Sequence, residues 1–141
     1  MERRSFIKSS CQACLLGFVG SAIVSELSGC SPAYPVFKTE VVNKELRIPL
    51  AIFDTVPTQI IHPKKWEYDI VVEKKDNAYS ALLLKCTHQP NELMPIGNNG
   101  YQCSRHGSRF DKEGKVKKGP AEKSLKKYET FIDNKELVIK V

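Results

Sequence analysis

Short apolar runs separated by polar turn residues recur along the chain from residue 45 onwards. These runs are rich in Val, Ile, Leu, Tyr and Phe, a composition that is typical of β-strands. None of them shows the period of a long amphipathic helix. The runs predicted as strands lie at 45–53, 68–74, 79–86, 126–132 and 135–141, and a shorter one follows residue 108.

Turn residues between these runs indicate how the strands connect. Asp133 and Asn134 separate the last two runs, which predicts a β-hairpin. Gly114 predicts another turn after the run that begins at residue 108. Strands this short form stacked antiparallel sheets or a small barrel. We therefore expect an all-β fold, either of stacked antiparallel sheets or of a small barrel.

The N-terminal segment has a different pattern and is expected to be a targeting signal. Residues 13–25 (ACLLGFVGSAIVS) are mostly apolar but rich in small residues, and Arg3 and Arg4 precede them. This core is shorter than the ~20 residues of a spanning helix and fits the ~7–15 residues of a signal peptide. The paired arginines resemble a twin-arginine export signal.

The sequence LSGC at 27–30 closes this segment and resembles a bacterial lipobox, in which the cysteine receives the lipid. Cys30 would then begin an exported, membrane-anchored lipoprotein that faces the periplasm or the cell exterior. The alternative is that Cys30 is an ordinary residue at the end of a signal. Cys11 and Cys14 lie within the signal and are interpreted as small hydrophobic residues.

The predicted organisation has three parts. Residues 1–29 form the signal peptide, and residues 30–43, with two prolines and no clear period, form a tether. Residues 44–141 form one domain.

The chain is basic, with 22 Lys and Arg, 16 Asp and Glu and a net charge of +6. Residues 1–29 contain three of the basic and two of the acidic residues, so the rest of the chain carries +5. Lysine pairs such as Lys64–Lys65 and Lys117–Lys118 are spread along the chain without a nucleic-acid-binding motif. We therefore expect no nucleic-acid partner. A basic surface can steer an acidic redox partner or lie near anionic lipid.

Two cysteines and two histidines recur in a matched pair of short segments, Cys86 with His88 and Cys103 with His106. An apolar strand runs directly into Cys86, and residues 87–100 are polar and rich in Pro, Gly and Asn, which predicts an irregular loop. Two such loops, at about 84–110, would bring four metal ligands together. Structural zinc is an alternative, but its cysteine pairs are usually more closely spaced. A disulfide between the cysteines would leave both histidines unexplained.

The motif CTH at 86–88, followed after 14 residues by CSRHGS at 103–108, resembles the Rieske iron–sulfur signature. Residues 119–128 (GPAEKSLKKY) add to the likeness, because they resemble the proline loop that covers one side of the cluster. The resemblance extends over about residues 45–141 and implies a Rieske-like fold with a two-loop cluster-binding subdomain. It also implies a Rieske-type [2Fe-2S] cluster as the cofactor.

Carried over by residue, the resemblance implies that Cys86 and Cys103 hold the inner iron and that His88 and His106 hold the outer one. With two thiolates and two neutral imidazoles, such a cluster has no net charge when oxidised, whereas four thiolates would give a dianion. An electron is therefore accepted more readily, and potentials are about −150 to +300 mV, against about −400 mV for plant-type ferredoxins. Ser108 is expected to donate a hydrogen bond to a bridging sulfide.

Three positions depart from the high-potential members of this family. Those members join the two loops by a disulfide, and the corresponding positions here are Asn91 and Arg105. A tyrosine whose hydroxyl faces a ligand sulfur is replaced by Phe110. We therefore expect a potential below that of the quinol-oxidising members, and do not expect the iron–sulfur subunit of a standard cytochrome bc complex.

The resemblance implies one-electron transfer, as a carrier or an electron-transfer subunit with a redox partner protein. The alternative is a small Rieske subunit of a larger oxidoreductase whose catalytic centre lies on another chain. A Rieske oxygenase needs a second iron on two histidines and a carboxylate. Only His62, predicted as a loop residue, remains after His88 and His106. We do not expect the chain to be an enzyme by itself.

Overall fold

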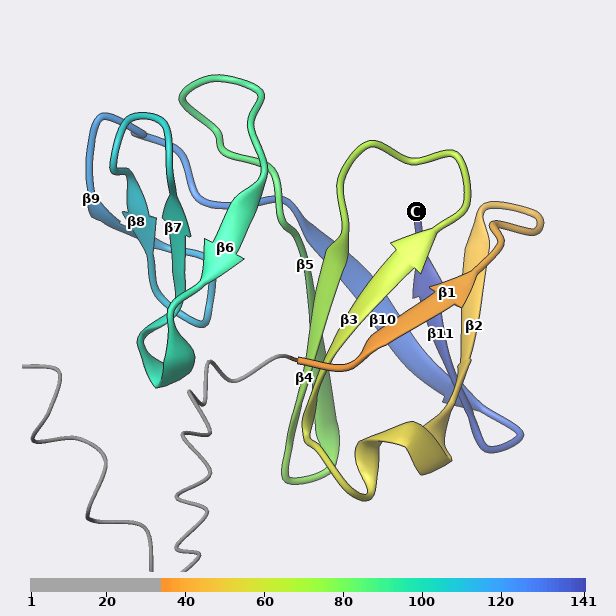
Figure 1. Ribbon diagram of the computed structural model, residues 1–141. Coiled ribbons are helices and arrows are strands. Elements are labelled where there is room, and N and C mark those ends of the chain that lie inside the picture. Colours follow the sequence, from red (N-terminus) through yellow and green to blue (C-terminus); the bar gives the residue numbers. More distant parts are fainter. Residues whose placement is uncertain (1–33) are drawn as a thin grey trace, which may run out of the picture. The chain divides into compact units, whose positions relative to one another are not determined.

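A computed structural model describes residues 34–141, in which the strands form a large and a small sheet (Figure 1). The seven strands of the large sheet have the order β1-β3-β4-β5-β10-β11-β2. They are β1 (Val36–Thr39), β2 (Glu45–Pro49), β3 (Thr58–Pro63), β4 (Ile70–Lys75), β5 (Ala78–Leu83), β10 (Lys127–Asp133) and β11 (Glu136–Lys140). The small sheet has the order β6-β7-β8-β9, with β6 (Leu93–Pro95), β7 (Tyr101–Cys103), β8 (Arg109–Phe110) and β9 (Val116–Lys118).

All but one of the strand pairs in these sheets are antiparallel, which confirms the predicted all-β fold. The exception is β1, which runs parallel to β3 with Val36 opposite Ile60. Strand β1 lies in the segment that has no clear period in the sequence. Its residues alternate between exposed and half-buried, and Phe37 packs against the core.

Strands β3, β4 and β5 are buried on both faces. Ile70 and Val72 belong to the apolar cluster inside the large sheet, whereas Val71, between them, faces the cluster shared with the small sheet. On β5, Ala81 belongs to the cluster inside the large sheet, and Leu82 belongs to the cluster shared with the small sheet. Burial on both faces explains why these segments are continuous apolar runs rather than alternating ones. It also confirms that Cys86 follows a buried strand.

Two predicted boundaries differ from the structure. The run predicted at 45–53 is a strand only as far as Pro49, after which η1 (Leu50–Phe53) is a 3₁₀ turn. Pro49 is tolerated because β2 lies at the edge of the sheet, where one side of the strand needs no hydrogen-bond donor. Strand β3 was not predicted, and His62 lies within it rather than in a loop.

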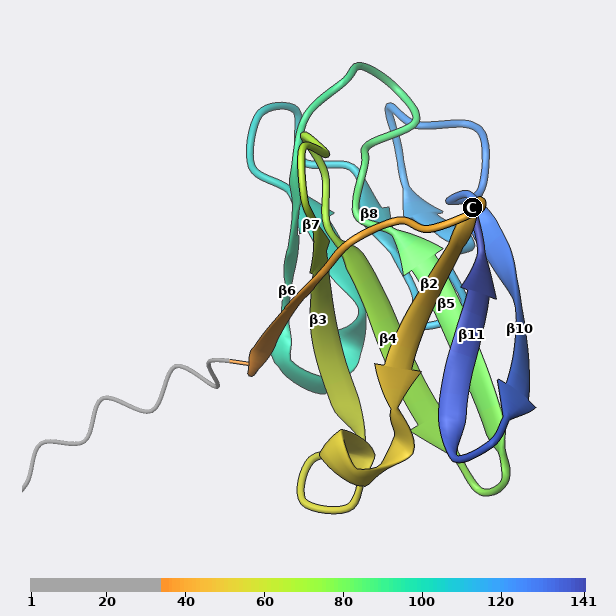
Figure 2. The same cartoon turned by 90° about the vertical axis from the view of Figure 1, so that its right-hand side faces the viewer.

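The β10–β11 hairpin forms where it was predicted, but its turn is displaced by one residue. Asp133 and Glu136 are paired, and the central residues Asn134 and Lys135 have φ of 45° and 68°. Two consecutive left-handed residues match the right-handed twist of the strands that they join. Figure 2 shows this turn at the lower end of the sheet, beside the lower end of β2.

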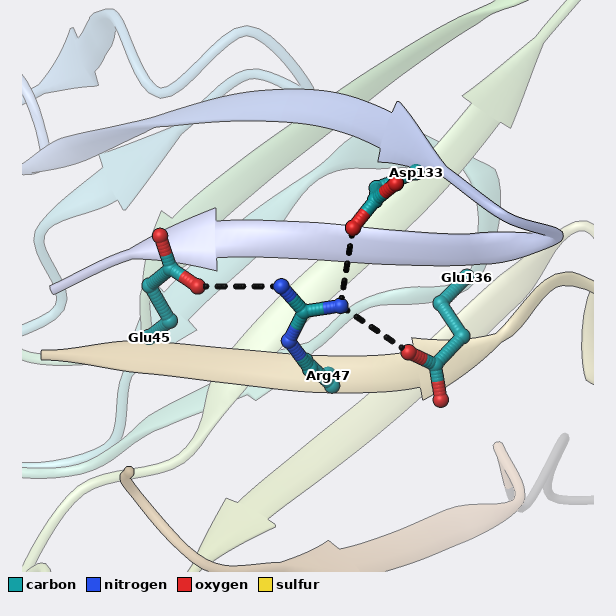
Figure 3. Close-up of polar contacts among 4 residues, drawn as sticks. All are labelled: Glu45, Arg47, Asp133 and Glu136. Carbon is teal, nitrogen blue, oxygen red and sulfur yellow. Dashed lines mark hydrogen bonds and ion pairs between the residues drawn. The ribbon is translucent and has the colours of Figure 1, made fainter. Parts of the chain in front are cut away.

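Arg47 on β2 joins this hairpin to the sheet edge through ion pairs (Figure 3). One guanidinium nitrogen lies 3.0 Å from Asp133 Oδ2 and 3.2 Å from Glu136 Oε2. The other terminal nitrogen lies 3.4 Å from Glu45 Oε2. Hydrogen bonds to Asp133 and Glu136 raise the pKa of Arg47. These ion pairs are exposed to solvent. We assign them a structural role, which is to hold β2 against the β10–β11 hairpin.

The predicted signal peptide, including Arg3, Arg4 and the lipobox with Cys30, lies outside the described residues. Within residues 34–141, no helix has the length and apolar character needed to cross a membrane.

Candidate metal centre

The two predicted ligand segments form matched loops that are closed by the same hydrogen bond. The first loop connects β5 to β6, and the N–H of Cys86 donates to the carbonyl oxygen of Asn91 at 2.9 Å. The second connects β7 to β8, and the N–H of Cys103 donates to the carbonyl oxygen of Ser108, also at 2.9 Å. Leu93 pairs with Cys103 in the β6–β7 register, so the two loops are neighbours.

The segment at 87–100 is less irregular than predicted. It contains β6 and the 3₁₀ turn η2 (Gly97–Asn99). Strand β6 has only three residues and depends on pairing with β7, which no local pattern reveals.

The two cysteines lie at the base of the loops. Cys86 and Cys103 are buried within the apolar cluster that includes Leu84, Leu93 and Phe110, and both are free thiols. The alternative disulfide between them is therefore not formed. Soft sulfur donors in an apolar base suit an iron–sulfur cluster.

Burial by itself raises the pKa of the Cys103 thiol. Hydrogen bonds to its sulfur reverse this shift and leave the pKa below its ordinary value, the largest of them from the backbone N–H groups of His106 and Arg105. The side chains of Cys86 and Asn91 act in the same direction. These donors favour the thiolate, which is the form that binds metal.

The two histidines lie on the solvent side of the same loops. His88 and His106 are exposed, and their ring centroids are 4.9 Å apart with the rings nearly perpendicular. No three His, Cys, Asp or Glu side chains gather around one metal position within the described part of the chain. A two-iron cluster requires only two protein ligands on each iron. A buried cysteine pair below an exposed histidine pair fits that requirement.

Gly107 and Ser108 shape the second loop. Gly107 has φ of +74°, and an added Cβ would meet no atom within 4 Å, so the backbone conformation rather than space requires glycine there. Ser108 is fully buried, and its Oγ accepts a hydrogen bond from the N–H of Ala121 at 3.1 Å. Its hydroxyl proton therefore remains available for another acceptor.

A third segment, between β9 and β10, borders the site. Thr87 Oγ1 donates to the carbonyl oxygen of Lys123 at 2.6 Å, and Ala121 and Leu125 are buried in the same apolar cluster as the cysteines. This segment is the one that resembles a proline loop. Figure 2 shows it beside the first loop at the upper end of the molecule.

Asn91 has a contact that sequence reasoning missed. Its Nδ2 lies 3.5 Å from Cys103 Sγ, so the first loop donates a hydrogen bond to a predicted ligand of the second. An asparagine in a polar loop carries no signal of such a role. Phe110 is fully buried and has no hydroxyl to offer. The remaining histidine, His62, contacts Asp69 at 2.6 Å.

Comparisons with known proteins identify the family. A family model described as the Rieske [2Fe-2S] domain matches residues 51–129, more than half of the chain. No curated protein matches the chain in sequence. The crystal structure of the cyanobacterial plasma membrane Rieske protein PetC3 from Synechocystis PCC 6803 is similar, with a TM-score of 0.54 and 25% identity over 66% of this chain and 95% of that one. The chain therefore belongs to the Rieske family, whose domain binds a Rieske-type [2Fe-2S] cluster and transfers electrons.

Proposed function

We propose that the chain binds the cluster between its two loops, with Cys86 and Cys103 on one iron and His88 and His106 on the other. The observation that carries this assignment is the separation of donors into a buried, free cysteine pair and an exposed histidine pair. A cluster of this type accepts and releases one electron.

The surrounding residues would stabilise the extra negative charge of the reduced site. The backbone N–H groups of the second loop and the Asn91 amide donate to Cys103 sulfur. Ser108 would donate its hydroxyl proton to a sulfur of the bound cluster, since its oxygen already accepts from Ala121. Because both histidines are exposed, a redox partner protein could approach them directly.

Metal analysis of the folded protein tests the ligand assignment. We expect two irons and two acid-labile sulfides per chain, the composition of a [2Fe-2S] cluster, and an electron paramagnetic resonance signal on reduction. His88→Ala should lose the cluster, whereas the matched control His62→Ala, on β3, should retain it. One zinc without labile sulfide, or equal cluster loss in both variants, would contradict the assignment.

The protein is proposed to act outside the cytoplasm, attached to a membrane by lipid on Cys30. The paired arginines, the short apolar core and the LSGC sequence support export of the folded protein and lipidation. The similar Synechocystis protein is a plasma membrane protein. Acyl chains contribute about 0.8 kcal/mol per buried methylene, so more than one chain would hold the protein firmly. Mass spectrometry of the mature N-terminus tests this, and an unprocessed terminus or an unmodified Cys30 would count against it.

Two roles are consistent with this site, a single electron carrier and an electron-transfer subunit of a larger oxidoreductase. Affinity purification from the native membrane distinguishes them. A carrier should be recovered alone, whereas a subunit should bring a large redox-active chain with it in constant ratio.

A further inference from the structure

A groove of about 530 Å³ runs between the first loop and the β9–β10 segment. Cys86 and His88 line one side of it, and Lys123 and Lys126 line the other. Leu83 and Pro90 add apolar surface. The groove therefore lies directly beside two of the proposed cluster ligands.

The charge of this groove is entirely positive. Its charged lining residues are Lys85, Lys123 and Lys126, and no Asp or Glu lines it. Three other grooves within residues 34–141 include carboxylates, such as Asp69 and Glu92 in one of them.

The three lysines are also free of ion pairs within residues 34–141. Glu122 is exposed next to Lys123 in the sequence, but it forms no ion pair with it. By contrast, Lys64, Lys112 and Lys140 each pair with a glutamate.

The local structure holds these charges at the groove. Lys85 Nζ lies over the ring of Tyr68, 5.0 Å from its centroid, and Lys126 Nζ lies 4.4 Å from the centroid of Tyr128. A cation over an aromatic ring gains a modest electrostatic attraction and loses less freedom when a partner binds. The Lys123 backbone is fixed by the hydrogen bond from Thr87.

We propose that this groove is the docking surface for an acidic redox protein, whose carboxylates would pair with Lys85, Lys123 and Lys126 beside His88. The inference rests on the proposed function, because it requires a redox centre behind His88. Lysines that form no ion pair within the described residues keep more of their field for an approaching anion than paired lysines do, which raises the association rate and orients the encounter.

The test uses the full-length holoprotein in neutral detergent and measures its one-electron oxidation by stopped flow. Hexacyanoferrate(III), a trianion, serves as the anionic probe and is reduced to hexacyanoferrate(II) as the cluster loses one electron. Tris(phenanthroline)cobalt(III) serves as the cationic probe. The groove variant is K123Q/K126Q. The matched control is K75Q/K135Q, which removes the same charge from the exposed last residue of β4 and from the exposed β10–β11 turn. Figure 2 shows the β4–β5 and β10–β11 turns at the lower end of the sheet.

The groove variant should react about threefold to tenfold more slowly than wild type with hexacyanoferrate(III) at about 0.01 M salt. The difference should shrink at about 0.1 M salt, where the screening length falls from about 30 Å to about 10 Å. The oxidation rate of the control variant should change much less. The reaction with the cationic probe should not be slower in K123Q/K126Q than in wild type.

If both double variants hold a reducible, coloured cluster and both slow the reaction with hexacyanoferrate(III) equally, the docking inference is overturned. The proposed function would then still stand. Loss of binding to phosphatidylglycerol vesicles by K123Q/K126Q, with an unchanged oxidation rate, would assign the groove to lipid and would also overturn it. Absence of the cluster from wild-type protein would contradict the proposed function itself, so the two failures are distinguishable.

Discussion

The side-chain amide of Asn91 on the first loop donates to the sulfur of Cys103 on the second, with Nδ2 and Sγ 3.5 Å apart. The same nitrogen lies 3.0 Å from the carbonyl oxygen of Glu92. The resemblance to the Rieske signature implies that Asn91 stands where high-potential members carry one of the two cysteines that join the loops. Here a hydrogen bond connects the loops instead, and it also places a donor on a proposed ligand sulfur.

Asn91→Ala should lower the reduction potential, because the lost donor stabilises the more negative, reduced state. Hydrogen bonds to sulfur set the potential of iron–sulfur centres. A change of about 0.7 kcal/mol corresponds to about 30 mV for one electron, which is the size we expect. Protein-film voltammetry measures it, with the exposed Asn98→Ala in η2 as control. Equal potentials for wild type and Asn91→Ala would show that this bond does not tune the site.

Ser108→Ala should reduce both stability and potential. Ser108 is fully buried, and its removal leaves the Ala121 N–H without the acceptor that it has at 3.1 Å. An unsatisfied buried donor costs about 1–3 kcal/mol. Thermal unfolding and voltammetry measure the two effects, and Ser124→Ala, on the exposed part of the same segment, is the control. A Ser108→Ala variant with normal stability but lowered potential would limit the role of this hydroxyl to the cluster.

Substitutions of two glycines should have different outcomes. Both Gly107 and Gly100 have positive φ, but an added Cβ at Gly100 would lie 2.1 Å from the carbonyl oxygen of Phe110, whereas Gly107 faces open space. Gly107→Ala should therefore cost about 1–2 kcal/mol, the ordinary penalty of a left-handed residue. Gly100→Ala should displace β7 from β8 and prevent normal cluster loading. Chemical denaturation and iron content distinguish the variants, and similar results for both would contradict this explanation.

Arg47→Met should destabilise the fold at low salt, because three carboxylates around it lose their counter-charge. The residues are exposed, so salt should screen the effect. Chemical denaturation should show a difference from wild type that shrinks as salt is added. Lys38→Met, an exposed substitution on β1, should show no such salt dependence. A loss of stability that does not depend on salt would instead indicate lost packing of the Arg47 side chain.

The sequence by itself determined the main strands and the two ligand loops. The runs at 68–74 and 79–86 and the two C-terminal runs correspond to β4, β5, β10 and β11, because their apolar content and turn residues are local features. The spacing of Cys86 with His88 and of Cys103 with His106 is local as well. It led to the Rieske family, which the family match confirms.

Tertiary structure decided the features that depend on partners distant in the chain. Val36 pairs with Ile60 across more than twenty residues, so β1 could not be recognised within an aperiodic segment. Strands β6 and β7, with three residues each, are too short to show a period and exist through their pairing. The donation from Asn91 to Cys103 and the lysine groove beside His88 likewise require loops from different strands to meet. Local patterns therefore determined which residues could form strands and ligands, whereas packing between distant segments determined the environment in which those ligands act.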